Sequence, residues 1–250
     1  MKTQTLFPIL VSVFIMSGCS TTPQFVALPD QVKHQISSTQ PYLEEGQIKM
    51  IADIESSNIA TYTGGGLLFG LMDCAVMAYR QDRAEGAMED LQKEFASYGL
   101  QEKVMAKLTT SFQQTGWLHA DPLKVLKAGQ DPAQIVQTST KDGVLFTSYV
   151  YRFNPKMTVM RGTIYLSLYP ASTKLKNLVK ADNPFDKPLF RFNVSAAYQL
   201  PSATNDLHQN AKQWAAENGR HLKEALNQIT TQNFIQFERA LKNPAHIADE

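Results

Sequence analysis

The sequence lacks an excess of charge of either sign. It contains 24 lysine and arginine residues and 23 aspartate and glutamate residues, which gives a formal net charge of +1. A chain balanced in this way creates no net field that would favour nucleic acid, so we expect no nucleic-acid partner. Hydrophobic residues make up 43% of the chain and aromatic residues 10%, which is typical of a folded globular protein rather than a disordered one.

The sequence also lacks the local motifs of common catalytic sites. No serine stands in a G-x-S-x-G pattern, which would present a nucleophile on a sharp turn. The acidic pairs Glu44 with Glu45 and Glu89 with Asp90 are adjacent in sequence, so their carboxylates point apart instead of facing one another. We therefore expect a non-enzymatic protein. A hydrolase whose site is assembled only in space is a further alternative.

Histidine is too sparse for an evident metal site. His208 and His221 are thirteen residues apart, which places them about 220° apart around a helix. Glu217, His221 and Glu224 share one helical face, but no third histidine or cysteine stands nearby. A solvated polar face accounts for these three residues, so we expect no metal and no cofactor.

The glycine cluster does not match a phosphate-binding loop. Gly64, Gly66 and Gly70 form G-x-G-x-x-x-G, whereas a dinucleotide-binding loop needs glycine where Phe69 stands. No Lys-Ser or Lys-Thr pair follows, as a nucleotide loop would require.

Small residues four apart after this cluster form a smooth helical ridge, which favours close approach of another backbone. The ridge consists of Gly66, Gly70, Cys74 and Ala78. Asp73 beside it opposes a membrane span. Packing against the protein's own core is the first interpretation of the ridge, and shallow membrane insertion or self-association are alternatives.

The most specific motif stands near the N-terminus. An apolar segment, 6–15, follows Lys2 and is too short to span a bilayer, which is typical of an export signal. Met16-Ser17-Gly18-Cys19 after it resembles the lipobox of bacterial lipoproteins. The resemblance implies that residues 1–18 are cleaved and that Cys19 is lipidated. An ordinary cleaved signal is the alternative, because Met16 stands where leucine is commoner.

The same resemblance implies a location. Ser20 follows the cysteine where inner-membrane retention signals carry aspartate, so we expect attachment to the outer membrane, with the periplasmic face favoured and the exterior face as the alternative. Several acyl chains, each stabilised by about 0.8 kcal/mol per buried methylene, would make the attachment effectively permanent. Lipidation of Cys19 would leave Cys74 as the remaining cysteine, so no intramolecular disulfide is expected, and Cys74 is expected to be buried.

Residues 19–46 are polar and contain three prolines, which predicts a tether, although packing along the domain surface is an equal alternative. Residues 47–250 are predicted to form one α+β domain. Alternation of apolar residues predicts strands over 47–54, 144–153, 158–169 and 190–198, and a short strand is predicted over 123–127. The strands over 144–153 and 158–169 are expected to form an antiparallel hairpin through Asn154 to Met157.

Helical periodicity predicts helices over 67–98, 101–114, 132–137 and 205–241. Gly99 is expected to separate the first two, and Gly219 to bend the last. A long polar connection is predicted over 170–188. The expected fold is an antiparallel meander with long helices packed on one face.

The glycine-rich run 64–73, a helix with Arg83 and Glu85, and the closing stretch from Trp214 to Leu226 resemble a broad group of proteobacterial lipoproteins. The order of elements is similar to the amino-terminal domain of TolB and to assembly lipoproteins of the curli-secretion and penicillin-binding-protein-activator type.

The resemblance implies an accessory or assembly subunit that binds an envelope protein partner or itself. No partner-binding residue can be aligned from these families. The aromatic-rich strands leave open an alternative, a carrier of a lipid or another small molecule.

Overall fold

The computed structural model of the chain describes residues 25–46, 50–53, 86, 88–179, 185 and 187–245. Several predictions concern residues outside these ranges: the cleaved signal, Cys19, the glycine cluster and most of the first predicted helix. The small-residue ridge of Gly66, Gly70, Cys74 and Ala78 also lies outside the described residues.

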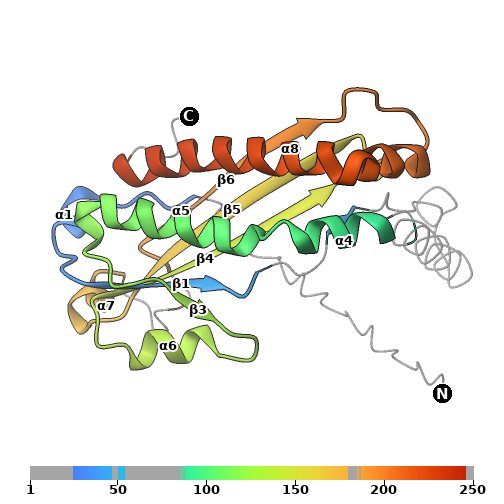
Figure 1. Cartoon of the computed structure of the whole chain (residues 1–250). Coiled ribbons are helices and arrows are strands. Elements are labelled where there is room, and N and C mark those ends of the chain that lie inside the picture. The colour runs from blue at the N-terminus through green and yellow to red at the C-terminus, as the bar shows by residue number, and fades with distance from the viewer. Residues whose placement is uncertain are drawn as a thin grey trace, which may run out of the picture.

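Within the described residues, a sheet of six strands forms the centre of the fold (Figure 1). The strands follow the order β3-β1-β4-β5-β6, and β2 pairs separately with β4. β5 is antiparallel to β4 and β6, whereas β1 is parallel to β3 and β4, and β2 is parallel to β4. The strands are β1 (Thr39–Glu44), β2 (Ile51–Ala52), β3 (Lys124–Leu126), β4 (Gly143–Phe153), β5 (Val159–Pro170) and β6 (Phe190–Gln199).

This arrangement confirms a mixed α and β fold but corrects the predicted meander. β4, β5 and β6 form the antiparallel part, while β1 lies in parallel between β3 and β4, so the sheet is mixed. β1 also belongs to the predicted tether. Leu28, Thr39 and Leu43 are completely buried, so the tether prediction is wrong for residues 25–46. Pro41 and its polar neighbours concealed this strand, because proline is rare inside sheets.

The β4–β5 hairpin forms as predicted. Its register pairs Gly143 with Pro170 and Phe153 with Met160. Asn154 closes the turn, because its side-chain Oδ1 accepts hydrogen bonds from the backbone N–H groups of Thr158 (2.8 Å) and Val159 (3.1 Å). The turn therefore sets which side chains of both strands face the helices.

The longer helices cover one face of the sheet, and Figure 1 shows α8 running alongside α5 and α4. The shorter α6 packs on the opposite face, where its Val136 joins Val144 and Phe146 in a second, smaller core. The helices are α1 (Asp30–Lys33), α4 (Glu89–Ser97), α5 (Leu100–Gln114), the 3-10 helix η1 (Gly116–Leu118), α6 (Pro132–Thr138), α7 (Thr173–Val179) and α8 (Leu207–Lys242).

Several helix boundaries fall where the sequence predicts them. Gly99 adopts a left-handed conformation with φ of 65° between α4 and α5. Asp131 caps α6, since its Oδ1 accepts a hydrogen bond from the N–H of Ala133 (2.9 Å). The predicted bend in α8 is also present: residues 216–219 leave the helical conformation, and Gly219 has φ of 68°. The two glycines can adopt the left-handed backbone conformation that ends or bends a helix, and Asp131 supplies a capping carboxylate.

The predicted connection over 170–188 is not wholly irregular. Residues 173–179 form α7, and its Leu175 is completely buried. The prediction of a continuous polar loop is therefore wrong for this helix. Leu175 is the one fully buried residue of this helix, and Val179 packs against the core while partly buried, which leaves too weak a pattern to recognise in the sequence.

The core lies between the sheet and the layer of α4, α5 and α8. Trp214 of α8 packs on Phe153 of β4, with ring centroids 5.1 Å apart, and its Nε1–H donates to the carbonyl of Met157 (2.7 Å). Further along α8, Phe237 packs on Phe192 of β6 at 5.3 Å. The apolar side of α8 is thus matched to the inner side chains of the antiparallel strands along most of its length.

Two isoleucines of α8 provide a matched test of this packing. Ile229 is completely buried, whereas Ile235 is 59% exposed. We expect Ile229→Ala to lower the free energy of unfolding by about 2–5 kcal/mol because it leaves a cavity. Ile235→Ala should change it by less than about 0.5 kcal/mol. Urea unfolding followed by circular dichroism measures both, and equal losses would contradict the placement of α8.

Candidate interaction surface

Among the described residues, part of the sheet face opposite α5 and α8 is not covered by a helix. Strand alternation places polar side chains on this face, and Tyr165 at its centre is 43% exposed. We use the name open face for the outward-facing side chains of the three long strands beyond the part covered by α6. These are Ser148, Val150, Arg152, Arg161, Thr163, Tyr165, Ser167, Arg191, Asn193, Ser195, Ala197 and Gln199.

Arg191 is the most firmly held cation of the open face. Its Nε–H donates to Ser167 Oγ (3.1 Å), and its Nη2 donates to the hydroxyl of Tyr169 (2.8 Å). The Tyr169 ring stacks on Phe185, with centroids 4.4 Å apart and an interplanar angle of 15°. These contacts fix the guanidinium at the beginning of β6.

The rest of the open face is joined by exposed polar contacts. The hydroxyls of Thr163 and Ser195 lie 3.0 Å apart across β5 and β6. Arg152 and Asp53 form an ion pair at 3.4 Å, in which both side chains are more than two-fifths exposed. Exposed pairs of this kind contribute only about 0–1 kcal/mol, so these groups can exchange their partners for those of a bound protein at little cost.

β6 is an edge strand of the described sheet. Its pairing with Val26 shows which of its backbone N–H and C=O groups point away from β5. The N–H of Val26 donates to the carbonyl of Arg191 (2.8 Å), and the N–H of Arg191 donates to the carbonyl of Val26 (3.0 Å). The backbone N–H and C=O groups of Arg191 thus point away from β5. Since residues of an antiparallel strand alternate in this respect, Ser195, Ala197 and Gln199 also direct their N–H and C=O groups outward.

Within the part of the chain that the structure describes, this part of β6 lacks the charge, proline or bulge that usually protects a sheet edge. Residues 194–199 contain no charged residue and no proline, and their register with β5 is unbroken by a bulge. The side chains of Ser195, Ala197 and Gln199 are exposed. Natural edge strands are usually blocked by charge, proline or a bulge, because an open edge can accept another strand. The edge of β6 is therefore suited to strand addition.

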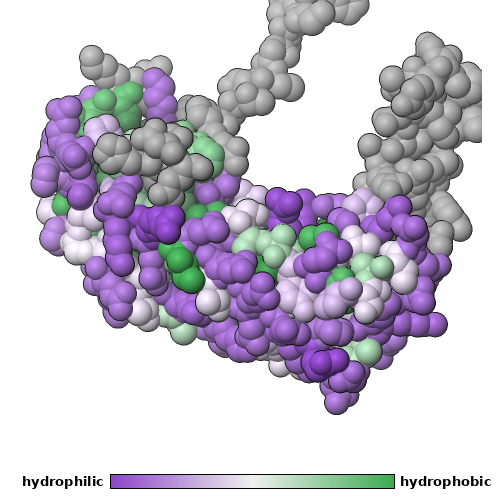
Figure 2. All heavy atoms as spheres, turned by 90° about the horizontal axis from the view of Figure 1, so that it is seen from above, coloured by the Kyte–Doolittle hydropathy of each residue, from purple (hydrophilic) through white to green (hydrophobic). Residues whose placement is uncertain are grey.

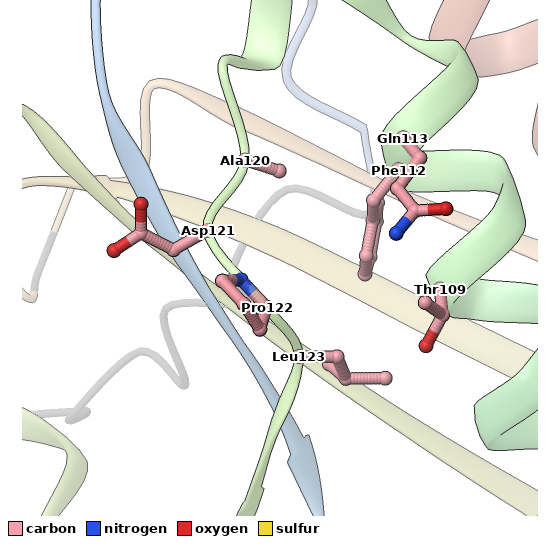
Figure 3. A pocket seen from close by; sticks show the side chains of 7 residues that line it. All are labelled: Thr109, Phe112, Gln113, Ala120, Asp121, Pro122 and Leu123. Atoms are coloured by element: carbon pink, nitrogen blue, oxygen red, sulfur yellow. The ribbon is translucent and has the colours of Figure 1, made fainter.

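A small pocket lies between α5 and residues 120–123, which form the segment that leads to β3 (Figure 3). Its volume is about 90 Å³, and pockets for drug-sized ligands hold roughly 300–1,000 Å³. In Figure 3 the carboxylate of Asp121 points away from α5. That carboxylate forms an ion pair with Lys141 at 2.7 Å. The pocket thus offers neither the size nor a free charged group for a substrate.

The aromatic residues that suggested a carrier are mostly interior. Eight aromatic residues of β4, β5 and β6 suggested this alternative, and of these only Tyr165 is exposed. Tyr151 is held by Thr230, whose Oγ1 lies 2.7 Å from its hydroxyl, and burial raises its pKa. Burial, with the nearby Glu102 carboxylate, raises the pKa of Tyr149 to about 12. The remaining members of the set are Phe153, Tyr169, Phe190, Phe192 and Tyr198. They serve as core.

Glu217, His221 and Glu224, which share one helical face in the sequence, do not form one cluster. His221 Nδ1 lies 3.8 Å from Glu224, whereas Glu217 lies in the bend of α8 and pairs with Arg220 at 2.8 Å. Among the described residues, no group of three or more histidine, cysteine, aspartate or glutamate side chains is arranged to hold a metal ion. His208 belongs to the other arm of α8, before the bend.

The surface over α8 offers little apolar area for docking. Figure 2 shows this side of the molecule as mainly hydrophilic, with hydrophobic residues in small separate patches. Ile235 is the most exposed large hydrophobic side chain described, at 59%. Isolated exposed hydrophobic residues are ordinary on soluble domains and do not mark an interface.

No protein-family model matches the sequence, and no curated protein matches it significantly. Within the part of the chain that the structure describes, no helix has the length and apolar content needed to cross a membrane. The candidate surface therefore depends on the geometry of the sheet alone. The alternation of apolar residues predicted β6 as a strand, but its position at the edge was not predicted, because that position follows from the strand order.

Hydrogen exchange tests the open edge directly. We expect the amide protons of Ser195 and Ala197 to exchange with solvent much faster than those of Val194 and Ala196, because only the latter two are hydrogen bonded to β5. Residue-resolved exchange measured by NMR distinguishes the two classes. Equal protection of all four amides would show that something covers the edge.

Proposed function

We propose that the protein is a non-enzymatic lipoprotein of the outer membrane, anchored through Cys19, that binds a protein partner in the cell envelope. The partner contributes an extended segment that adds to the edge of β6. The protein acts as an accessory or assembly subunit and holds this segment near the membrane.

The observation that carries the proposal is the unprotected edge of β6. Strand addition supplies affinity through backbone hydrogen bonds, and neighbouring side chains supply specificity. At the edge, Ser195, Ala197 and Gln199 offer outward backbone donors and acceptors. On the adjoining open face, Tyr165 offers an exposed aromatic ring, a residue type common in protein interfaces.

The sequence supports the anchor. In the lipobox-like Met16-Ser17-Gly18-Cys19, the cysteine that would be acylated stands six positions before the first described residue, Phe25. A lipid-anchored domain meets only partners that reach the same membrane. This restriction suits an assembly subunit better than a freely diffusing carrier.

Substitution of the two cysteines tests the anchor. Cys19→Ala should abolish acylation and release the protein from the membrane fraction, because the stabilisation of about 0.8 kcal/mol per buried methylene is lost. Cys74→Ala is the matched control and should keep both properties. Metabolic labelling with palmitate and fractionation of cells measure them. Retention of label in Cys19→Ala would contradict lipidation at this residue.

Crosslinking with backbone variants tests the edge. A photoactivatable phenylalanine at Ser195 should crosslink in cells to one partner protein. Ala197→Pro removes an outward N–H without removing a bond to β5, so it should weaken the crosslink about tenfold, equivalent to one or two hydrogen bonds, with little loss of stability. Ala197→Val changes the side chain but keeps the N–H, and should preserve the crosslink.

The comparison of these variants decides the mode of binding. Equal crosslinking in Ala197→Pro and Ala197→Val would show that the edge accepts no strand. Crosslinks only between copies of this chain would replace the partner with self-association and so contradict the proposal. Thermal unfolding of each variant verifies that the fold is retained.

A further inference from the structure

The lipid anchor and the folded domain are separated by very little chain. Six residue steps join Cys19 to Phe25, and a fully extended chain of this length spans at most about 22 Å. Val26 is already paired with Arg191, and the N–H of Leu28 donates to the carbonyl of Pro244 (2.9 Å). If Cys19 is lipidated as proposed above, the domain cannot stand far off, and one part of its surface must face the lipid.

One end of the domain lies closest to this attachment. β6 begins at Phe190, next to the Val26 pairing, and β5 ends at Pro170, directly before α7. β1 and β4 begin at the same end, where Thr39 pairs with Gly143. Figure 1 shows α1 and α7 together at this end of the molecule. We call it the α7 end.

The α7 end combines exposed hydrophobic side chains with lysines. Leu178 of α7 is 42% exposed, and Phe25 is 41% exposed. Lys174 lies four residues before Leu178, on the same side of the helix, and is also exposed. Lys176 of α7 is half-buried, and Lys187, in the segment before β6, is exposed.

The carboxylates described at this end already have partners. Asp142 accepts hydrogen bonds from the backbone N–H (2.9 Å) and the hydroxyl of Ser37, and it lies near Lys174. Asp30 lies 3.9 Å from Lys33 within α1. Lys174 and Lys187 are thus exposed at the same end as the exposed apolar groups Leu178 and Phe25. Such a combination fits the boundary between anionic headgroups and acyl chains.

We propose that the α7 end lies on the surface of a phospholipid membrane. Leu178 and Phe25 enter the interfacial region, and Lys174, Lys176 and Lys187 contact anionic headgroups. This inference rests on the proposed lipidation of Cys19, which brings the domain to the membrane, and it adds the orientation in which the domain sits there.

Fluorescence quenching in vesicles tests the orientation. The lipidated full-length protein, with Cys74→Ser, is labelled with a fluorophore at Leu178→Cys or at Lys156→Cys. Lys156 lies in the turn at the other end of β5, about 36 Å away along the strand. In vesicles of brominated phosphatidylcholine with phosphatidylglycerol, we expect strong quenching of the label at residue 178 and none at residue 156.

Charge reversal tests the role of the lysines. The combined variant carries Lys174→Glu, Lys176→Glu and Lys187→Glu. At low salt, each substitution should lower the equilibrium constant for contact between the α7 end and the membrane by at least about fivefold. The signal is a loss of quenching at residue 178 while the protein still floats with the vesicles. Added salt should have the same effect on the unaltered protein.

The outcomes separate this inference from the proposed function. Protein that floats with the vesicles but shows equal quenching at residues 178 and 156 overturns the orientation and leaves the anchor intact. Quenching at residue 178 that is unchanged by charge reversal overturns the role of the lysines. Protein that carries no lipid at Cys19 and does not float contradicts the proposed function itself.

Discussion

The packing of α8 against β4, β5 and β6 determines how the rest of the described structure is arranged. Trp214 fills the space between Phe153 and Tyr198, at centroid distances of 5.1 and 5.8 Å. At the other end of the helix, Phe237 contacts Phe192 of β6 and Phe112 of α5. These contacts hold β4, β6 and both helices in one core, and burial of such large rings is the main source of stability in a domain without disulfides among its described residues.

Polar groups within this layer add specificity to the packing. Asn233 of α8 donates through Nδ2 to the carbonyl of Gly162 in β5 (3.0 Å), and Thr230 meets the hydroxyl of Tyr151. A Cβ atom at Gly162 would lie only 2.5 Å from Ile229 Cγ2, so glycine is needed for α8 to approach the sheet. A shift of α8 by one residue would leave these buried groups without partners, at a cost of about 1–3 kcal/mol each. The helix is therefore fixed in one register.

Because α8 packs on only one face of the sheet, several elements of the structure could be predicted from the sequence. β4, β5 and β6 alternate because only one of their faces is buried, and α8 shows a helical repeat because only one of its sides is buried. Both patterns are local, so single stretches of sequence reveal them. Gly219 and Asp131 mark boundaries for equally local reasons, a left-handed backbone and a capping carboxylate.

The remaining features depend on contacts distant in sequence. β1 is buried because Thr39 pairs with Gly143 across about a hundred residues, and its own sequence, with Pro41 and several polar side chains, is atypical of an interior strand. α7 contributes only Leu175 and the partly buried Val179 to the core, which is too little to show a helical repeat. The edge position of β6 follows from the strand order, which no local pattern contains. The candidate surface could not be predicted from the sequence for this reason.

The placement of β1 inside the sheet changes how the proposed function would operate. A tether of 28 residues would have let the domain move far from the membrane, whereas six residues hold it close. With the α7 end on the lipid, β6 begins near the membrane and leads away from it. Its open residues, Ser195 to Gln199, then lie about 16–30 Å along the strand from Phe190. A partner segment added there would stand beside β6, above the headgroups and within the periplasm. In the proposed arrangement, the short connection would position the edge for a partner that itself approaches the membrane.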